Sequence, residues 1–397
     1  MNVITITREY GAGGAELART LAQALGWELL DRELLHQAAE SQQVPDAEVE
    51  RLDERAITMA DRFQLHSPHQ KYLDGLRHAV QQAAERGRVI LVGRGARHLL
   101  GDRPDCLHLR LVAPRTRRAE RMTRLEGWSP EVALARCTEV DRTRRQFTRY
   151  FFGDAAIQSS QYDLVVNTGR VSLGAVADTV TGVVRDAMMA ASCPSAAGPS
   201  EAGKRVLTLS RELGAGDQGF APPLAERLGL NVCDREMLEQ QAIRLGVPEA
   251  ELEKIDEQPA GIFQRFRPGS IHQRYFQALE QLTHELAERG EVLLVGRGGC
   301  WFLREHPTAF HVHLTATTAV RLRRVMEYRW VREDVAKKSL AQSDAQRRSF
   351  CENYFGADWT DPLEYHLTVN TGRLGPLAVD VVARVAQRHW STSALAG

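Results

Sequence analysis

The 397-residue sequence lacks several features that would assign it to particular classes of protein. No apolar run approaches the roughly 20 residues needed to cross a bilayer. The sequence begins on a strand-like segment rather than on a basic and apolar leader, so we expect neither a secretory signal nor a membrane partner. Charge of one sign is not in excess, because Lys+Arg and Asp+Glu number 51 each. That balance argues against a nucleic-acid partner.

Cysteine is sparse and scattered, with six residues and no C-x-x-C pair. This pattern favours reduced thiols and a cytoplasmic protein over a disulfide framework. A zinc site would need clustered ligands, and the sequence shows none. We therefore predict no metal site formed by the protein's own side chains.

The sequence contains a long internal repeat with a spacing of 203 residues, as Arg8 and Arg211 illustrate. Five further segments repeat at the same spacing, beginning at Asp31 and Asp234, Val92 and Val295, Asp141 and Asp344, Phe152 and Phe355, and Val166 and Val369. A repeat this long indicates tandem domains rather than a solenoid. We predict a first domain over residues 1–190, a linker over 191–204 and a second domain over 205–391.

Each copy alternates short apolar runs with helical patterns. Residues 3–7, 27–30, 88–92, 106–112 and 162–167 read as strands, and residues 15–25, 72–85, 115–124, 130–150 and 173–189 read as helices. Continuous apolar strands that alternate with helices are typical of a parallel sheet covered on both faces. The predicted fold class is α/β, with two tandem P-loop kinase-like domains, each a parallel sheet of about five strands flanked by helices.

A glycine-rich segment follows the first strand of each copy, at residues 11–14 and 214–219. Glycines between a strand and a helix let backbone N–H groups approach an anion, and the helix N-terminus adds a partial positive charge. Against the phosphate-loop pattern G-x-x-x-x-G-K-[ST], Gly14 stands at the lysine and Ala15 at the Mg²⁺-binding hydroxyl. The loop keeps the backbone cradle and lacks both side chains.

Other charged motifs accompany this loop. An Asp31-Arg32 pair ends the second strand, Arg94 follows the third, and an arginine-rich helical pair contains Asp141 and Arg144. Phosphoryl transfer depends on positioning the substrates and on positive charge around the phosphoryl group more than on covalent catalysis. Arginine suits this role because its guanidinium can donate two hydrogen bonds to one phosphate. This set is the one that a nucleoside-monophosphate kinase needs.

These motifs resemble the cytidylate kinase-like family, across nearly all of both halves. The family's glycine loop also lacks the lysine, whereas it usually has an arginine at the position of Ala15. The resemblance implies a kinase that uses ATP and Mg²⁺, the ion being held mainly by nucleotide phosphates and water, with CMP or dCMP as acceptor. It implies that ATP phosphates bind at Gly11, Ala12, Gly13, Gly14, Ala15 and Glu16, and the monophosphate at Asp31, Arg32 and Arg94. Catalytic roles are expected for Arg94, Arg118, Asp141 and Arg144. The equivalents in the second copy are Gly214, Gly216, Asp234, Arg235, Arg297, Asp344 and Arg347.

Simpler interpretations exist for several of these residues. Asp31 is a favoured N-cap for the helix expected after it. The arginines of residues 115–124 suit a solvated helix face, and the aromatic residues of 147–152 suit packing. Residues 167–170, Asn-Thr-Gly-Arg, read as a strand end and turn. Gly214, Gly216 and Gly219 also match the dinucleotide pattern G-x-G-x-x-G, but the first copy has Glu16 where the third glycine should be.

The two copies differ at informative positions. Gly14 becomes Asp217, which would place a carboxylate beside phosphate, and Arg19-Thr20 becomes Pro222-Pro223, which should shorten or kink the first helix. We predict ATP-dependent phosphoryl transfer to a nucleoside monophosphate, with copy 1 the better catalytic candidate and copy 2 weakened or regulatory. A non-catalytic nucleotide-binding protein and a kinase for another small acceptor are the alternatives. The sequence leaves open an intramolecular pseudo-dimer of the two halves.

Overall fold

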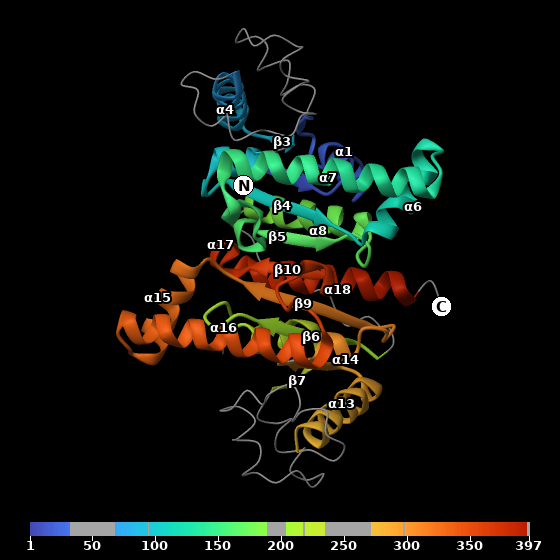
Figure 1. Cartoon of the computed structure of the whole chain (residues 1–397), viewed down its shortest axis with the longest axis vertical. Helices are drawn as coiled ribbons and strands as arrows, with labels where there is room; N and C mark the ends of the chain where they lie inside the picture. Colours follow the sequence, from blue (N-terminus) through green and yellow to red (C-terminus); the bar gives the residue numbers. More distant parts are fainter. Residues whose placement is uncertain are drawn as a thin grey trace. The chain divides into compact units, whose positions relative to one another are not determined.

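Each half of the chain folds around its own parallel β-sheet, as the computed structural model in Figure 1 shows. The structure describes residues 1–31, 68–93, 95–188, 204–216, 219–234, 271–296 and 298–394. The chain divides into two units, Met1–Ser192 and Cys193–Gly397, called unit 1 and unit 2 below. All but one residue of the expected linker, 191–204, lie outside the described residues, so the exact domain boundaries stay a prediction.

Unit 1 has five strands in the order β2-β3-β1-β4-β5, and every neighbouring pair is parallel. Its strands are β1 (Val3–Arg8), β2 (Glu28–Leu30), β3 (Val89–Val92), β4 (Cys106–Val112) and β5 (Leu164–Asn167). Its helices are α1 (Gly14–Leu25), α4 (Pro68–Arg86), α5 (Ala96–Leu100), α6 (Arg115–Glu126), α7 (Pro130–Phe152) and α8 (Leu173–Met188), with 3-10 turns at Asp154–Ile157 and Ser159–Gln161.

Unit 2 repeats this plan with the order β7-β8-β6-β9-β10. Its strands are β6 (Val206–Arg211), β7 (Asn231–Cys233), β8 (Val292–Val295), β9 (Ala309–Thr315) and β10 (Leu367–Asn370). Its helices are α9 (Ala221–Leu228), α13 (Ile271–Arg289), α14 (Gly299–Phe302), α15 (Thr318–Arg329), α16 (Glu333–Phe355), α17 (Thr371–Leu374) and α18 (Leu377–Ala394), with a 3-10 turn at Pro362–Glu364.

The apolar strands explain the layered arrangement. All residues of β3, β5, β8 and β10 are buried, so both faces of each central sheet must be covered. Helices supply that cover in both units (Figure 1): α1 packs against α8, and α4 packs against β3 and α5. The predicted α/β class, with two parallel five-stranded sheets flanked by helices, is confirmed. The short helix α5 is an element that the sequence pattern did not indicate.

The first helix differs between the units, as the sequence predicted. Helix α1 has 12 residues and starts at Gly14, whereas α9 has 8 residues and starts at Ala221, with prolines in its first turn. Proline has no backbone N–H to donate, so Pro222 and Pro223 remove two of the donors that a helix N-terminus offers. Within the described ranges, no helix combines the length and apolar character needed to cross a membrane.

Candidate phosphate-binding site

The candidate site of unit 1 lies where its parallel strands end. β1 leads into the glycine loop, residues 9–13, while Asp31 follows β2 and Gly95 follows β3. Because all strands run in one direction, their carboxyl ends share one edge of the sheet, which is where open α/β sheets bind ligands.

Steric constraints explain the glycines of this loop. Gly11 and Gly13 have φ values of +78° and +86°, a region that favours glycine. A Cβ on Gly11 would lie 2.9 Å from the carbonyl oxygen of Arg118, and one on Gly13 would lie 2.6 Å from Cδ1 of Leu173. The loop conformation therefore depends on glycine for both its dihedral angles and its close packing.

Helix α1 begins directly after the loop, and no side chain caps its N-terminus. Gly13 occupies the N-cap position and makes no side-chain hydrogen bond, and the first-turn N–H groups, including those of Gly14 and Ala15, have no acceptor within the helix. Ala15 and Glu16 are exposed at this end. An anion bound here would accept from these donors and interact favourably with the helix dipole.

Arg118 and Asp141 hold the backbone of this loop. Asp141 Oδ1 accepts from the N–H of Tyr10 at 2.8 Å, and Arg118 Nη1 donates to the carbonyl of Tyr10 at 2.9 Å. The two side chains also pair with each other, with 2.6 Å between Arg118 Nη1 and Asp141 Oδ2. Arg118 is only 5% exposed. This geometry makes both residues positioning residues for the loop.

Glu9 completes this buried network. Its Oε2 lies 3.3 Å from Arg118 Nε and accepts from the N–H of Ala113 at 3.2 Å. Burial raises the pKa of the Glu9 carboxyl above its usual range, although the nearby Arg118 guanidinium opposes that rise. Glu9 was not among the predicted site residues, and the signal available in the sequence was its identity with Glu212 in the second copy.

The other side of the loop is fastened by Thr168 and Arg121. Thr168 Oγ1 donates to the carbonyl of Ala12 at 2.9 Å, and Arg121 Nη1 donates to the carbonyl of Gly11 at 3.2 Å. Asn167 Oδ1 accepts from the N–H of Gly169 at 3.1 Å, which forms the turn expected for the Asn-Thr-Gly-Arg motif. Arg121 thus places a guanidinium at the loop that lacks the P-loop lysine.

Arg144 lies on α7 and contacts the strand end and the loop at Arg8 and Tyr10. Its Nη1 donates to the carbonyl of Arg8 at 2.9 Å, and its guanidinium carbon lies 5.6 Å from the centre of the Tyr10 ring. Arg144 is half-buried, so it combines a structural contact with access to the edge of the site.

The remaining predicted residues have mixed outcomes. Asp31 is half-buried directly after β2. Arg32, Arg94, Arg235 and Arg297 lie outside the described residues, so their roles stay predictions. The aromatic residues at the end of α7 pack mainly against one another, with 4.7 Å between the ring centres of Phe147 and Phe151.

Unit 2 keeps the same loop framework. Arg321 pairs with Asp344 at 2.6 Å and with Glu212 at 3.4 Å, and Thr371 Oγ1 donates to the carbonyl of Ala215 at 2.6 Å. Gly214 has φ +79° and Gly216 has φ +152°. Asp234 is half-buried after β7, and Arg347 is half-buried on α16. The frameworks match, whereas the helix that follows the loop does not.

The donor chemistry limits how a metal ion would be held. In the part of the chain that the structure describes, no cluster of three His, Cys, Asp or Glu side chains is placed to bind one. At the start of α1, the position of a P-loop hydroxyl carries the methyl group of Ala15.

Comparisons with known proteins identify the family of both halves. Residues 3–170 and 206–373 both match the Cytidylate kinase-like family. Relatives include a cytidylate kinase of Pyrococcus horikoshii, 25% identical over 187 residues, covering 47% of this chain and 90% of the relative. A cytidylate kinase of Thermococcus kodakarensis is 24% identical over 193 residues, covering 48% and 92%. Among solved structures, shikimate kinase from Bacteroides thetaiotaomicron aligns with 13% identity and a TM-score of 0.30, over 46% of this chain and 98% of that one. Because the family match spans most of both halves, the chain belongs to the cytidylate kinase-like family, represented by two tandem copies.

Proposed function

We propose that unit 1 transfers the γ-phosphoryl group of ATP to a nucleoside monophosphate, with CMP or dCMP as the acceptor. The observation that carries this proposal is the glycine loop, which is held at Tyr10, Gly11 and Ala12 and opens onto the uncapped start of α1. A loop fixed on both sides presents its N–H groups without reorganising when phosphate binds, which favours transition-state stabilisation.

Each part of the site has a role in this reaction. Residues 11–16 would bind the ATP phosphates, and Asp31, Arg32 and Arg94 would face the acceptor. Arg118 and Asp141 would act through the backbone of Tyr10, while Arg144 and Arg121 would supply positive charge beside the loop. Bound Mg²⁺ would offset phosphate charge. The acceptor is already an anion, so this chemistry asks for positioning and charge rather than for a strong base.

Unit 2 is the weaker candidate for catalysis. Its first helix starts at Ala221 with prolines in the first turn, so it offers fewer donors to phosphate than α1 does. Asp217 also replaces Gly14 in the sequence, which would place negative charge where phosphate binds. These differences support assigning phosphoryl transfer to unit 1.

A non-catalytic nucleotide-binding protein is the second candidate. It is favoured by Gly14 and Ala15, which stand where a P-loop kinase has its lysine and its Mg²⁺-binding hydroxyl. The backbone cradle alone would still bind phosphate. The two candidates differ in one measurable property, the formation of ADP in the presence of an acceptor.

A coupled assay of ADP formation, with the full chain, ATP, Mg²⁺ and each nucleoside monophosphate, tests the proposal. We expect turnover with CMP or dCMP. Gly14→Asp, which introduces the unit 2 residue, should abolish it. Gly14→Ala is the matched control, because its Cβ meets the same Arg8 side chain at 2.7 Å without adding charge. ATP binding without ADP formation for any acceptor would instead favour the binding protein.

A further inference from the structure

A buried histidine, His366, fastens the start of strand β10 in unit 2, and it is 6% exposed. Its Nδ1 accepts from the backbone N–H of His311 at 3.0 Å, and its own backbone N–H donates to the carbonyl of His311 at 2.9 Å. Because Nδ1 accepts a hydrogen bond, it carries no proton. The ring is therefore neutral, with its single proton on Nε2.

Unit 1 makes the same contact with a carboxylate. Asp163 stands 203 residues before His366, and its Oδ2 accepts from the backbone N–H of His108 at 2.6 Å. An ordinary carboxylate stays ionised down to about pH 4, whereas an ordinary imidazole takes up a proton near pH 6.5. The exchange of Asp for His therefore changes the pH at which this acceptor is lost.

Three ring side chains face His366. The ring centres of Phe310 and His311, on β9, lie 4.9 and 5.0 Å from that of His366, and the ring centre of His389, on α18, lies 4.9 Å away. Burial lowers the pKa of His389, so this neighbour also resists a positive charge. A proton on His366 would lie in a buried cluster of rings, where placing a charge is costly.

Glu364 is the carboxylate closest to His366 along the chain, and it is engaged by other residues. Its Oε2 accepts from Trp301 Nε1 at 3.0 Å and pairs with Arg304. Its negative charge is thus already offset by a guanidinium, so it has little to gain from a protonated imidazole.

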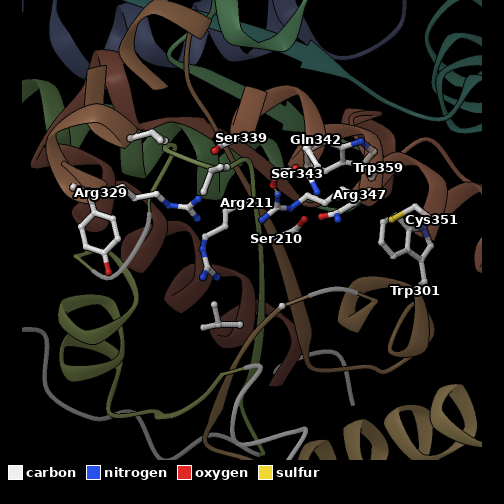
Figure 2. A pocket seen from close by; sticks show the side chains of 16 residues that line it. Ser210, Arg211, Trp301, Arg329, Ser339, Gln342, Ser343, Arg347, Cys351 and Trp359 are labelled. Carbon is white, nitrogen blue, oxygen red and sulfur yellow. Dashed lines mark hydrogen bonds between the residues drawn. The ribbon is translucent and has the colours of Figure 1, made fainter. Parts of the chain in front are cut away.

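Strand β10 connects this histidine to the glycine loop of unit 2. All four of its residues are buried, and they pair with residues 312–315 of β9. Thr371, the residue after β10, donates from Oγ1 to the carbonyl of Ala215 in the loop. The loop follows Ser210 and Arg211, which line the pocket of unit 2 shown in Figure 2. Release of the start of so short a strand would therefore weaken the support of the loop at its other end.

We propose that His366 makes the pairing of β10 with β9, and with it the glycine loop of unit 2, sensitive to pH. Protonation places an N–H on Nδ1, so two donors face each other and the hydrogen bond from His311 is lost. The opened segment takes up this proton near pH 6.5, so opening becomes more favourable as pH falls below that value. Unit 1 keeps its anchor over the same range, because Asp163 is the acceptor there. Unit 2 is thus the pH-responsive half of the chain, whichever unit transfers phosphate.

Hydrogen exchange of the full chain, near pH 7.5 and near pH 5.5, measures the opening constants of peptides that cover residues 212–216 and 367–371. One histidine that is neutral in the closed state raises the opening constant about tenfold between these pH values, once intrinsic exchange rates are corrected for. We expect at least this rise in the wild type. His366→Asn keeps an acceptor that does not titrate, so its rise should be about tenfold smaller. His284→Asn is the matched control, because His284 is exposed on α13, and it should follow the wild type.

The reciprocal exchange tests the same reasoning in unit 1. Asp163→His should increase the pH dependence of opening about tenfold in peptides that cover β5 and the glycine loop of unit 1. The measured quantity is the ratio of opening constants at the two pH values, so a uniform loss of stability in a variant does not affect it. An unchanged ratio in either exchange would overturn the proposal, and so would a reduction in His284→Asn equal to that in His366→Asn.

Discussion

Replacing Arg118 by methionine should destabilise unit 1 strongly, because this arginine neutralises a buried site. Its side chain is 5% exposed, and it pairs with Asp141, whose side chain is 10% exposed, and with Glu9. It also donates to the carbonyls of Ala113 and Tyr10 at 2.8 and 2.9 Å. Methionine keeps much of the volume and removes all of these donors.

The expected loss of stability in Arg118→Met comes from the buried carboxylates and carbonyls that are left without a donor. Breaking a buried ion pair by removing one partner costs about 3–5 kcal/mol, because an uncompensated charge stays behind. Two carboxylates and two carbonyls lose a donor here, which places Arg118→Met toward the upper end of that range. Arg117→Met is the matched control on the same helix. Its ion pair with Glu120 joins side chains that are 67% and 55% exposed, and such pairs contribute about 0–1 kcal/mol.

The loss of stability in Arg118→Met should also depend on pH, and the sign follows from the pKa of Glu9. Burial raises the pKa of Glu9, and Arg118 is the strongest opposing influence, so the pKa should rise further in Arg118→Met. A carboxyl whose pKa is higher in the folded state binds more protons there than in the unfolded chain. Stability therefore falls as pH increases from the unfolded pKa through the folded one. The variant should be less destabilised near pH 5 than near pH 8.

Native-state hydrogen exchange of the full chain, read on peptides of unit 1 at increasing urea concentration, measures this free energy without separating the units. Arg118→Met within 1 kcal/mol of the wild type would refute the reasoning. A loss equal to that of Arg117→Met, or a loss with no dependence on pH, would also contradict it.

Two further predictions concern single positions. Gly13→Ala should lower the free energy of unfolding by roughly 2 kcal/mol or more and abolish ADP formation, because φ is +86° and the added Cβ would lie 2.6 Å from Leu173. Gly174→Ala is the control, because its Cβ meets open space, and it should leave thermal unfolding unchanged. Burial lowers the pKa of His313 to about 3, and the nearby Arg347 and Arg321 lower it in the same direction. The unfolded chain therefore binds a proton here that the folded unit 2 does not. Its free energy of unfolding should fall by up to about 1.4 kcal/mol for each pH unit between 6.5 and that pKa. His313→Gln should flatten that acid limb in hydrogen exchange, and an unchanged slope would exclude His313 as its source.

The strands and the shortened helix α9 were predictable because their signals are local, and the repeat was predictable because the two halves share residues at a constant spacing. Buried strands read as apolar runs, and prolines 222 and 223 shorten α9 because they lack N–H groups. The contacts of Arg118 and Asp141 were not predictable in this way. Their partners are backbone atoms of Tyr10, 108 and 131 positions away in the chain, and a backbone acceptor leaves no pattern in side-chain spacing. The short helix α5 was missed because five residues carry too little periodicity.

Comparison of the two units separates residues that build the loop from residues that meet a ligand. The carboxylate–arginine network and the threonine that binds the loop carbonyl have the same partners in unit 2, although the helix after that loop has changed. Their retention is therefore explained by the need to compensate buried charge and backbone groups, whether or not a unit transfers phosphate. Activity has to be judged instead from residues that contact substrate. Gly14, which becomes Asp217, is the position at which we propose that the two units differ toward phosphate.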